Sequence, residues 1–229
     1  MAQESQSFRE IVAKALDMIE DGMIVGLGSG RAASAFVDGL GEQVRAGLSI
    51  RGVPTSEATA ALAKRVGIPL TTLDDNVQID VDMDGADEVD PQLNLIKGYG
   101  AAFVREKIVA AAARRLIILV GPEKIVPMLG TRGRLPIEVV PFGAGPCRRR
   151  LEQMGYSSEL RRKGEDLVIT DNGNYILDCQ VSAIANPTSL DQALLRIPGV
   201  VGTGLFVGMA DTVLIQRENG AEVQQRERE

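Results

Sequence analysis

Carboxylate side chains crowd one short stretch of the chain. Residues 80–88 read D-V-D-M-D-G-A-D-E and follow a segment in which apolar and polar residues alternate as in a strand. Open α/β sheets bind ligands at the carboxyl ends of their strands, so Asp84 and Asp87, separated by the flexible Gly85-Ala86 pair, can face one crevice. The alternative is turn and cap chemistry, which suits Asp and accounts well for one of these residues but poorly for the cluster.

The same stretch carries the D-x-D-x-D-G spacing of EF-hand calcium loops. Counted from Asp80, the twelfth position should hold a bidentate Glu and holds Pro91 instead, and the preceding residues indicate a strand rather than a helix. The chain has no His, and its two cysteines, Cys147 and Cys179, lack CxxC spacing. We therefore expect no metal site and two reduced thiols that behave as small apolar side chains.

A lysine and a glutamate follow further along. Lys97 precedes Gly98-Tyr99-Gly100, and Glu106 lies in the early turns of a helix predicted from about Ala101 to Arg115. The helical neighbours of Glu106 are all apolar, namely Ala102, Phe103, Val109, Ala110 and Ala113. Burial on such a face raises the pKa of a carboxyl group toward the range in which it can accept and return a proton near pH 7. A buried structural ion pair with Lys97 or Arg105 is the alternative.

A glycine-rich turn near the N-terminus, residues 26–31, follows a predicted strand and opens a predicted helix. Its N–H groups and the helix dipole favour an anion. It is neither a dinucleotide fingerprint, since Arg31 replaces the last small residue and no acid ends the second strand at 51–53, nor a Walker loop. We expect it to bind the phosphate of a small metabolite with Arg31 as a partner, the alternative being a tight turn without a ligand.

Composition limits the function classes. Without His among 229 residues, the chain excludes Ser-His-Asp and Cys-His catalysis, so proton transfer falls to Asp, Glu, Lys, Tyr or Cys. A net charge of −6 and 3% aromatic residues disfavour nucleic acid as a partner, and the basic runs 148–150 and 161–163 are expected to be solvated. No signal peptide or membrane-length apolar run is visible, which predicts a soluble cytoplasmic protein.

The elements that must position these residues alternate between strand and helix over the first two-thirds of the chain. This alternation predicts an α/β fold with a doubly wound, mainly parallel, Rossmann-like sheet. Its segments include a strand at 68–73, the strand 116–120, a late strand at 212–216 and a charged tail at 218–229. The order βαββαβ after about residue 131, with Asn172-Gly173 as a hairpin turn, predicts an inserted ferredoxin-like α+β domain. The predicted domains are 1–130 with 208–229, and 131–207.

Several strings resemble the type A ribose-5-phosphate isomerase family, and the resemblance covers nearly the whole chain. These strings are D-G-A-D-E-V-D at 84–90, N-L-I-K-G-Y-G-A-A at 94–102, R-E-K-I-V-A at 105–110, P-I-E-V-V-P-F at 136–142, T-D-N-G-N-Y-I-L-D at 170–178 and I-P-G-V-V at 197–201. The resemblance implies interconversion of D-ribose 5-phosphate and D-ribulose 5-phosphate through an enediolate, without a metal or other cofactor. It also implies a homodimer or homotetramer and a place in the non-oxidative pentose phosphate pathway.

The resemblance assigns a role to each motif residue. It implies that Glu106 is the base that moves the proton between C1 and C2, and that Asp84 and Asp87 bind sugar hydroxyls and help ring opening. Lys97 is expected to stabilise oxyanion charge, as its position and charge also suggest, and Lys124 to bind substrate. The expected substrate-binding residues are Ser29, Gly30, Arg31, Ala32, Gly85, Ala86, Gly98, Tyr99, Gly100 and Lys124.

The chain departs from the family pattern in two places. The phosphate loop, usually G-T-G-S-T-A, reads G-S-G-R-A-A at 28–33, so that two hydroxyl donors are replaced, one of them by Arg31. Tyr99 stands where a third glycine is usual. The alternative function is a sugar-phosphate-sensing module on the same fold that binds without turnover, although the chain leaves no N-terminal room for a DNA-binding helix-turn-helix. An amino-sugar phosphate deaminase is disfavoured because that chemistry is expected to use histidine.

Overall fold

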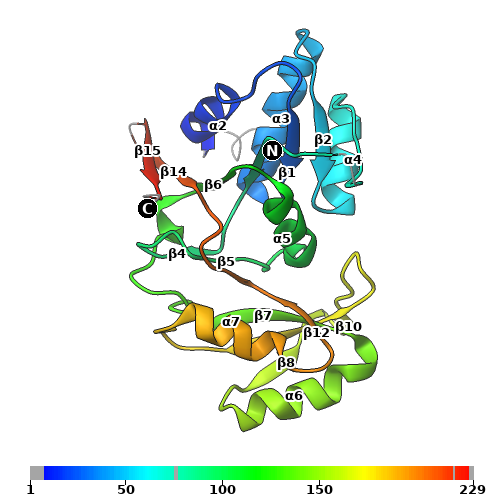
Figure 1. Cartoon of the computed structure of the whole chain (residues 1–229), viewed down its shortest axis with the longest axis vertical. Helices are drawn as coiled ribbons and strands as arrows, with labels where there is room; N and C mark the ends of the chain where they lie inside the picture. The colour runs from blue at the N-terminus through cyan, green and yellow to red at the C-terminus, as the bar shows by residue number, and fades with distance from the viewer. Residues whose placement is uncertain (1–7, 75–76, 219, 227–229) are drawn as a thin grey trace. The chain divides into compact units, whose positions relative to one another are not determined.

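A computed structural model describes residues 8–74, 77–218 and 220–226 of the chain. Its internal contacts divide it into two compact units. Unit 1 comprises residues 1–86, 105–124 and 209–229, and unit 2 comprises residues 87–104 and 125–208. Figure 1 labels the elements of both units. In the described part of the chain, no helix is both long and apolar enough to cross a membrane.

Unit 1 is built on a six-stranded sheet with the order β15-β14-β6-β3-β1-β2. The parallel strands are β1 (Ile24–Leu27), β2 (Arg51–Pro54), β3 (Val81–Asp84), β6 (Leu116–Val120) and β14 (Thr212–Arg217). The remaining strand, β15 (Gly220–Gln225), runs antiparallel to β14. The predicted α/β class with a mainly parallel sheet is confirmed.

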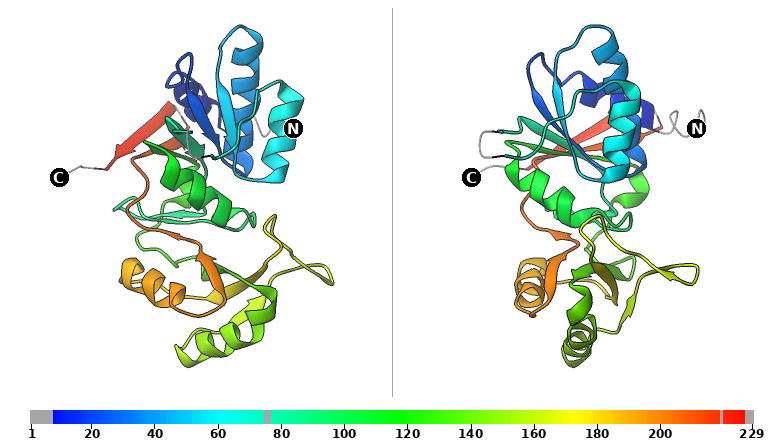
Figure 2. Two further views of the ribbon diagram at one scale, coloured as in Figure 1. Left: turned by 45° about the vertical axis from the view of Figure 1, so that its right-hand side comes forward. Right: turned by 90° about the vertical axis from the view of Figure 1, so that its right-hand side faces the viewer.

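The helices of unit 1 cover both faces of this sheet. They are α2 (Arg9–Leu16), α3 (Arg31–Arg45), α4 (Glu57–Val66) and α5 (Phe103–Ala112), whose first two residues belong to unit 2. Side chains alternate between the two faces of a strand: Leu27 and Met83 pack into a cluster with apolar residues of α2, α3 and α4. Gly26 points the other way, and a Cβ there would lie 2.8 Å from Val109 of α5. The sheet is therefore doubly wound, as predicted (Figure 2).

The strand predicted at 68–73 is not formed. Only Leu70 pairs, in a single parallel bridge with Gly52 of β2. Pro69 has no N–H group to donate to a sheet ladder, and the residues from Leu70 to Asp74 are exposed or half-exposed. The segment therefore gains too little burial and too few hydrogen bonds to extend as a strand.

The charged tail predicted at 218–229 also differs from the structure. Residues Gly220–Gln225 form β15, which pairs with β14 over six residues from Thr212 to Arg217. Ala221 and Val223 alternate with polar residues, and Ala221 packs against the core cluster of unit 1. The charged composition concealed this alternation, which is short but sufficient once β14 supplies a partner.

Unit 2 contains a four-stranded antiparallel sheet with the order β12-β7-β11-β8. Along the chain its elements are β7 (Arg134–Val139), α6 (Ala144–Gln153), β8 (Ser158–Leu160), β11 (Tyr175–Gln180), α7 (Pro187–Leu195) and β12 (Val200–Thr203). This is the βαββαβ order predicted from the sequence. A short hairpin, β9 (Arg162–Lys163) and β10 (Asp166–Leu167), follows β8.

A second sheet of unit 2 has three short strands in the order β13-β5-β4. They are β4 (Glu88–Val89), β5 (Leu95–Ile96) and β13 (Leu205–Phe206). Because β13 pairs with β5, residues 87–104 group with residues 125–208. The compact units thus differ from the predicted domains in residues 87–104, 125–130 and 208, and the division into functional domains stays a prediction.

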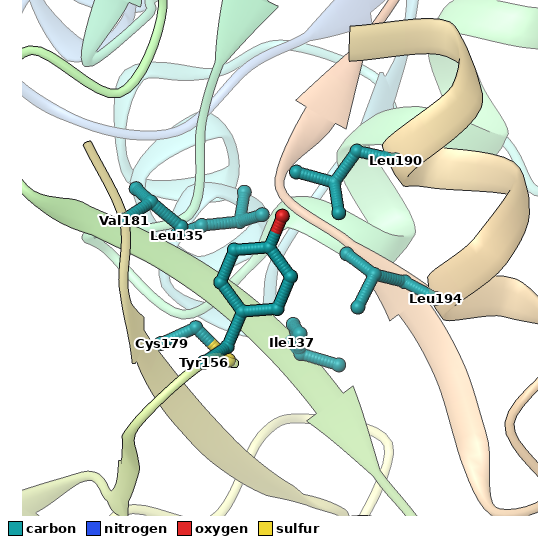
Figure 3. Close-up of a pocket in the computed structure, with 7 residues that line it drawn as sticks. All are labelled: Leu135, Ile137, Tyr156, Cys179, Val181, Leu190 and Leu194. Carbon is teal, nitrogen blue, oxygen red and sulfur yellow. The ribbon is translucent and has the colours of Figure 1, made fainter. Parts of the chain in front are cut away.

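A small apolar pocket lies inside unit 2 (Figure 3). It is lined by Leu135, Ile137, Tyr156, Cys179, Val181, Leu190 and Leu194. Burial, and secondarily the negative charge of Asp178, raises the pKa of the Cys179 thiol from 9.0 to about 12. A thiol of that pKa is not a nucleophile near pH 7. Both cysteines are free and buried, which agrees with their predicted role as small apolar side chains.

Candidate active site

The loop between β1 and α3 is hydrogen-bonded to Asp84 and to its neighbour Met83 at the carboxyl ends of β1 and β3. Gly28 donates its N–H to the Met83 carbonyl (2.9 Å), and a Cβ on Gly28 would overlap the Asp84 carboxylate. Oδ1 of Asp84 accepts the N–H groups of Ser29 (3.1 Å) and Gly85 (2.7 Å). The carboxylate is buried, with 1% of the residue exposed, and is oriented by main-chain donors.

Helix α3 begins directly after this loop. Gly30 is its N-cap residue and has a φ of +94°, a conformation that favours glycine. The first turn of an α-helix leaves N–H groups without intrahelical partners, and the helix dipole makes this end attractive to anions. The Arg31 side chain is exposed here, whereas the Ala32 side chain is buried, so Ala32 can offer only its main chain. This helix start can bind a phosphate group.

The hydroxyl of Ser29 is engaged within unit 1. Its Oγ lies 2.9 Å from Thr55 Oγ1, 2.8 Å from Ser56 Oγ and 3.0 Å from Thr59 Oγ1. Thr59 also donates to the carbonyl of Gly28 (3.1 Å). This hydroxyl cluster fastens the β1–α3 loop to the turn that precedes α4, so the Ser29 side chain shapes the loop.

Glu106 lies in the first half of α5 and only 5% of it is exposed, in agreement with the apolar helix face predicted for it. The end of α5 lies near the start of β3, since Gln78 Nε2 donates to the Ala112 carbonyl (3.0 Å), so the helix runs opposite to the strands. Val109 lies beside Gly26, in the second half of β1. Glu106 is one turn earlier on the same face, a shift of roughly 4.5 Å toward the carboxyl edge of the sheet.

The remaining predicted residues of unit 1 follow β3 and β6. The Cβ position of Gly85 is 3.7 Å from the Leu119 carbonyl oxygen and 3.9 Å from that of Ser29. After β6, the 3₁₀ helix η2 (Pro122–Lys124) carries Lys124, whose N–H donates to the Gly121 carbonyl (3.1 Å). Strands β6, β3 and β1 are neighbours. We refer to the predicted residues after these strands, together with Glu106 of α5, as the carboxyl-edge group: Ser29, Gly30, Arg31, Ala32, Asp84, Gly85, Ala86, Glu106 and Lys124.

The other predicted residues belong to unit 2, on residues 97–101, which we term the lysine loop, and at Asp87. Lys97 is 3% exposed, donates its main-chain N–H to the Gly204 carbonyl (2.9 Å), and holds its Nζ 5.5 Å from the centroid of the Phe206 ring, a cation–π distance. Gly98 has a φ of +112°, and a Cβ there would lie 2.7 Å from the Phe103 ring. Both features require glycine after the lysine.

Tyr99 anchors the lysine loop to the rest of unit 2. Its N–H donates to Asp87 Oδ2 (2.9 Å), and its ring packs against the apolar cluster of this unit. The Arg134 guanidinium stacks 3.9 Å from the ring centroid, and the hydroxyl donates to the Arg134 carbonyl (3.3 Å). Burial raises the pKa of Tyr99, with the charges of Glu88 and Asp87 acting in the same direction and Arg134 opposing them. The departure from glycine therefore adds an anchor to the loop.

The basic run at 161–163, predicted to be solvated, is only partly so. Arg162 and Lys163 are exposed, but the Arg161 side chain is 9% exposed and forms an ion pair with Asp178. Arg161 also donates to main-chain carbonyls of the lysine loop. The prediction was wrong for Arg161 because the overall charge of the chain says nothing about the burial of a single position. Asp178, an acid among apolar residues of a predicted strand, was the available signal for a buried cation.

Main-chain N–H groups bind several carboxylates in and next to the acidic stretch, and for Asp90 they belong to a local turn. Asp80 accepts the N–H of Ile24 (2.9 Å), and Asp90 accepts those of Gln92 (2.9 Å) and Asn94 (2.8 Å). Glu88, fully buried, accepts the N–H groups of residues 130 (2.7 Å) and 132 (2.8 Å). Asp80, Glu88 and Asp90 therefore have structural roles, and Asp84 and Asp87 stay the predicted candidates for chemistry.

Each unit thus supplies part of the predicted set. Unit 1 has buried Asp84 and Glu106 and a helix start suited to an anion, and unit 2 has buried Lys97 and half-buried Asp87. Such groups can transfer protons and stabilise an oxyanion. In the ranges that the structure describes, no group of three or more His, Cys, Asp or Glu residues could hold a metal ion.

Comparisons with known proteins agree with one another. Residues 51–220 match the family model described as ribose 5-phosphate isomerase A (phosphoriboisomerase A). Ribose-5-phosphate isomerase A of Bradyrhizobium diazoefficiens is 50% identical to this chain, in an alignment that covers 95% of each of the two chains. The solved ribose 5-phosphate isomerase A of Methanocaldococcus jannaschii has a TM-score of 0.92 at 36% identity, over 97% of this chain and 99% of that one. A solved D-ribose-5-phosphate isomerase in complex with phospho-erythronic acid has a TM-score of 0.92 at 41% identity, over 96% and 99%.

Proposed function

Because the chain belongs to the ribose 5-phosphate isomerase A family, we propose that it interconverts D-ribose 5-phosphate and D-ribulose 5-phosphate with Glu106 as the base. The observation that supports this role is the burial of the Glu106 carboxylate on α5, toward the carboxyl edge of the unit 1 sheet. Glu106 also lies within the residues that the family model matches.

The proposed reaction moves one proton between neighbouring carbons. Glu106 takes the proton from C2 of the open-chain aldose, and the electron pair of that C–H bond forms the enediolate. The same proton returns to C1, while a proton is exchanged from O2 to O1, which leaves the ketose. The reaction needs no oxidant or reductant, and we propose that it needs no metal.

Lys97 and the two aspartates act on the substrate oxygens in this proposal. The Lys97 ammonium stabilises the negative charge of the enediolate. Asp84 and Asp87 bind sugar hydroxyls and assist ring opening. Main-chain N–H groups hold Asp84 at Oδ1 and Asp87 at Oδ2. Both carboxylates are therefore oriented before substrate binds, which reduces the entropic cost of reaching the reactive geometry.

We further propose that the phosphate binds at the start of α3. The N–H groups of Gly30, Arg31 and Ala32 and the Arg31 guanidinium are donors suited to phosphate, and Lys124 adds a second positive charge. Main-chain groups of residues 85–86 and 98–100 complete the proposed substrate-binding set. The Ser29 hydroxyl supports the loop from within and contributes to binding through its position.

The proposal is tested by measuring ribulose 5-phosphate formation from ribose 5-phosphate in EDTA. We expect turnover by the parent chain, and Glu106→Gln to lower kcat by about 10³-fold because the amide cannot accept the proton. Glu42→Gln, at an exposed position of α3, is the matched control and should leave kcat unchanged. Full activity in Glu106→Gln would refute the assignment of the base. Binding of phospho-erythronic acid without turnover would favour the sugar-phosphate-sensing alternative.

The setting of the enzyme is also proposed. We infer that it acts in the cytoplasm, in the non-oxidative pentose phosphate pathway, as a homodimer or homotetramer. The family resemblance supports these statements. Light scattering coupled to size exclusion would determine the assembly, and a monomer at micromolar concentration would contradict it.

A further inference from the structure

A buried arginine of unit 2 binds the lysine loop although it is not among the predicted site residues. Nη1 of Arg161 donates to the carbonyls of Gly98 (2.7 Å) and Tyr99 (3.2 Å). Its Nε and Nη2 donate to the two carboxylate oxygens of Asp178. All three nitrogens of the guanidinium are therefore engaged, on a side chain that is 9% exposed.

The peptide group between Gly98 and Tyr99 is held at both ends. Its carbonyl oxygen accepts from Arg161, and its N–H donates to Asp87 Oδ2 (2.9 Å). Rotation of this peptide would break both bonds at once. Arg161 and the Asp87 carboxylate are thus coupled through a single planar group.

The loop that carries this peptide has an uncommon backbone. Gly98 has a φ of +112°, and Ala101, which is not glycine, has a φ of +69°. The Ala101 N–H donates to the Gly98 carbonyl (3.1 Å), the same oxygen that Arg161 binds. Such conformations persist where the surrounding structure over-determines them. Arg161 supplies part of that restraint.

We propose that Arg161, held by Asp178, is a positioning residue for the isomerase: it fixes the Gly98–Tyr99 peptide and thereby orients the Asp87 carboxylate and the loop that begins at Lys97. This inference rests on the proposed function, since it assigns Arg161 a role in that reaction. Arg161 touches none of the reacting atoms in this scheme. It acts through main-chain groups of the lysine loop.

The chemistry of the side chain supports an arginine-specific role. A guanidinium can bind a carboxylate with two nitrogens and still direct a third at carbonyl groups, whereas a lysine ammonium is a single point charge. Asp178 also lies 3.8 Å from Arg134, so its charge keeps a partner when Arg161 is replaced. Replacement of Arg161 by Lys therefore removes the reach to the loop while a positive charge is retained.

The first test compares Arg161→Lys with Arg162→Lys, whose parent residue is the exposed neighbour on β9. We expect Arg161→Lys to lower kcat for ribose 5-phosphate by about 10–100-fold, with a smaller change in KM. Amide hydrogen exchange of residues 97–102 should accelerate at least about tenfold as the loop is released. Arg162→Lys should change neither quantity. A kcat for Arg161→Lys within about twofold of the parent value would overturn the proposal.

The second test is chemical rescue of Arg161→Gly, read only on protein that is folded by circular dichroism. Added guanidinium ion at millimolar concentration should restore kcat several-fold in a saturable manner, and urea or sodium chloride at the same concentration should not. Absence of rescue in the folded variant would contradict the positioning role. If Arg161→Gly does not fold, the lysine variant decides the matter.

Failure of this inference and failure of the proposed function give different results. A parent chain without isomerase activity would refute the function, and the exchange rates of residues 97–102 would still report whether Arg161 restrains the loop. Normal parent turnover with unchanged kcat and unchanged exchange in Arg161→Lys would refute the inference alone.

Discussion

The carboxyl-edge group and the lysine loop are held in place by different kinds of interaction. In the carboxyl-edge group, main-chain N–H groups orient Asp84, and neutral hydroxyls fasten the β1–α3 loop. In the lysine loop, the ion pair of Arg161 with Asp178 fixes the main chain, and Arg134 covers Tyr99. The first group is therefore sensitive to added volume, and the second to the loss of charge or of guanidinium geometry.

Among the substitutions that test this comparison, Gly28→Ala is expected to have the largest effect. Gly28→Ala places a methyl group against both the carboxylate and the main chain of Asp84, so one of them must move. We expect kcat/KM for ribose 5-phosphate to fall by about 10²-fold, because small displacements of reactive groups are costly. The free energy of unfolding should decrease by about 1–3 kcal/mol. Steady-state kinetics and urea denaturation measure the two effects.

The matched control for Gly28 is Gly145→Ala in α6. A Cβ at Gly145 would have Arg149 Nη1, at 3.8 Å, as its neighbour, which is ordinary contact. Alanine is a better helix former than glycine, so this variant should be as stable as the parent chain or more so. Full activity in Gly28→Ala would show that the reaction does not depend on the present position of Asp84.

An intermediate effect is expected for Arg31→Ala, which tests whether the start of α3 binds the phosphate. Arg31→Ala removes a guanidinium from the proposed phosphate site and should raise KM for ribose 5-phosphate by about tenfold, the value of a charge-assisted hydrogen bond. Its effect on kcat should be far smaller, because the phosphate does not react. Arg65→Ala, at an exposed position of α4, is the control. An unchanged KM would mean that the Arg31 side chain does not bind the phosphate.

The effect that is smallest near pH 7 concerns a buried thiol of unit 2 and is seen as a pH dependence of stability above pH 9. The Cys179 thiol, with a pKa raised from 9.0 to about 12, keeps its proton in the folded chain while the unfolded chain loses it above pH 9. The stability that this thiol contributes is therefore complete below pH 9 and is lost as the pH rises toward 12, by at most about 1.4 kcal/mol per pH unit.

Denaturant unfolding of the parent chain and of Cys179→Ala at several pH values isolates this contribution. The parent should be more stable at pH 8, since the alanine leaves a cavity in the pocket of Figure 3. The difference should shrink as the pH rises above 9. A difference independent of pH would show that the thiol titrates alike in the folded and unfolded chains.

The parts of the fold that could be predicted from the sequence are those fixed by short-range pattern. The apolar run Leu116–Val120 and the apolar neighbours of Glu106 on its helix predicted β6 and a buried glutamate, and the structure contains both. Motif strings also predicted which residues to examine. These signals are local, so they survive without knowledge of the neighbouring strands.

The parts that could not be predicted depend on partners distant in the chain. Arg161 is buried because Asp178, seventeen residues later, faces it across the β8–β11 pairing. The predicted tail contains β15 because β14 offers an unpaired strand edge to it. The lysine loop belongs to unit 2 because β13 pairs with β5. Tyr99 became an anchor because Arg134 stacks on it. Apart from the short alternation in β15, none of these pairings leaves a periodic pattern in the sequence.

The segment that fails to form a strand at 68–73 has a consequence for aggregation. Gly52 of the edge strand β2 donates to the Pro69 carbonyl (2.8 Å) and accepts the Thr71 N–H (2.9 Å), so part of this edge is already occupied. At the opposite edge lies β15, whose side chains include the polar residues Glu222 and Gln224. Exposed strand edges are templates for intermolecular sheet growth, and short, polar or covered edges resist it. The segment 68–73 therefore covers part of the β2 edge and limits the pairing of the unit 1 sheet with other chains.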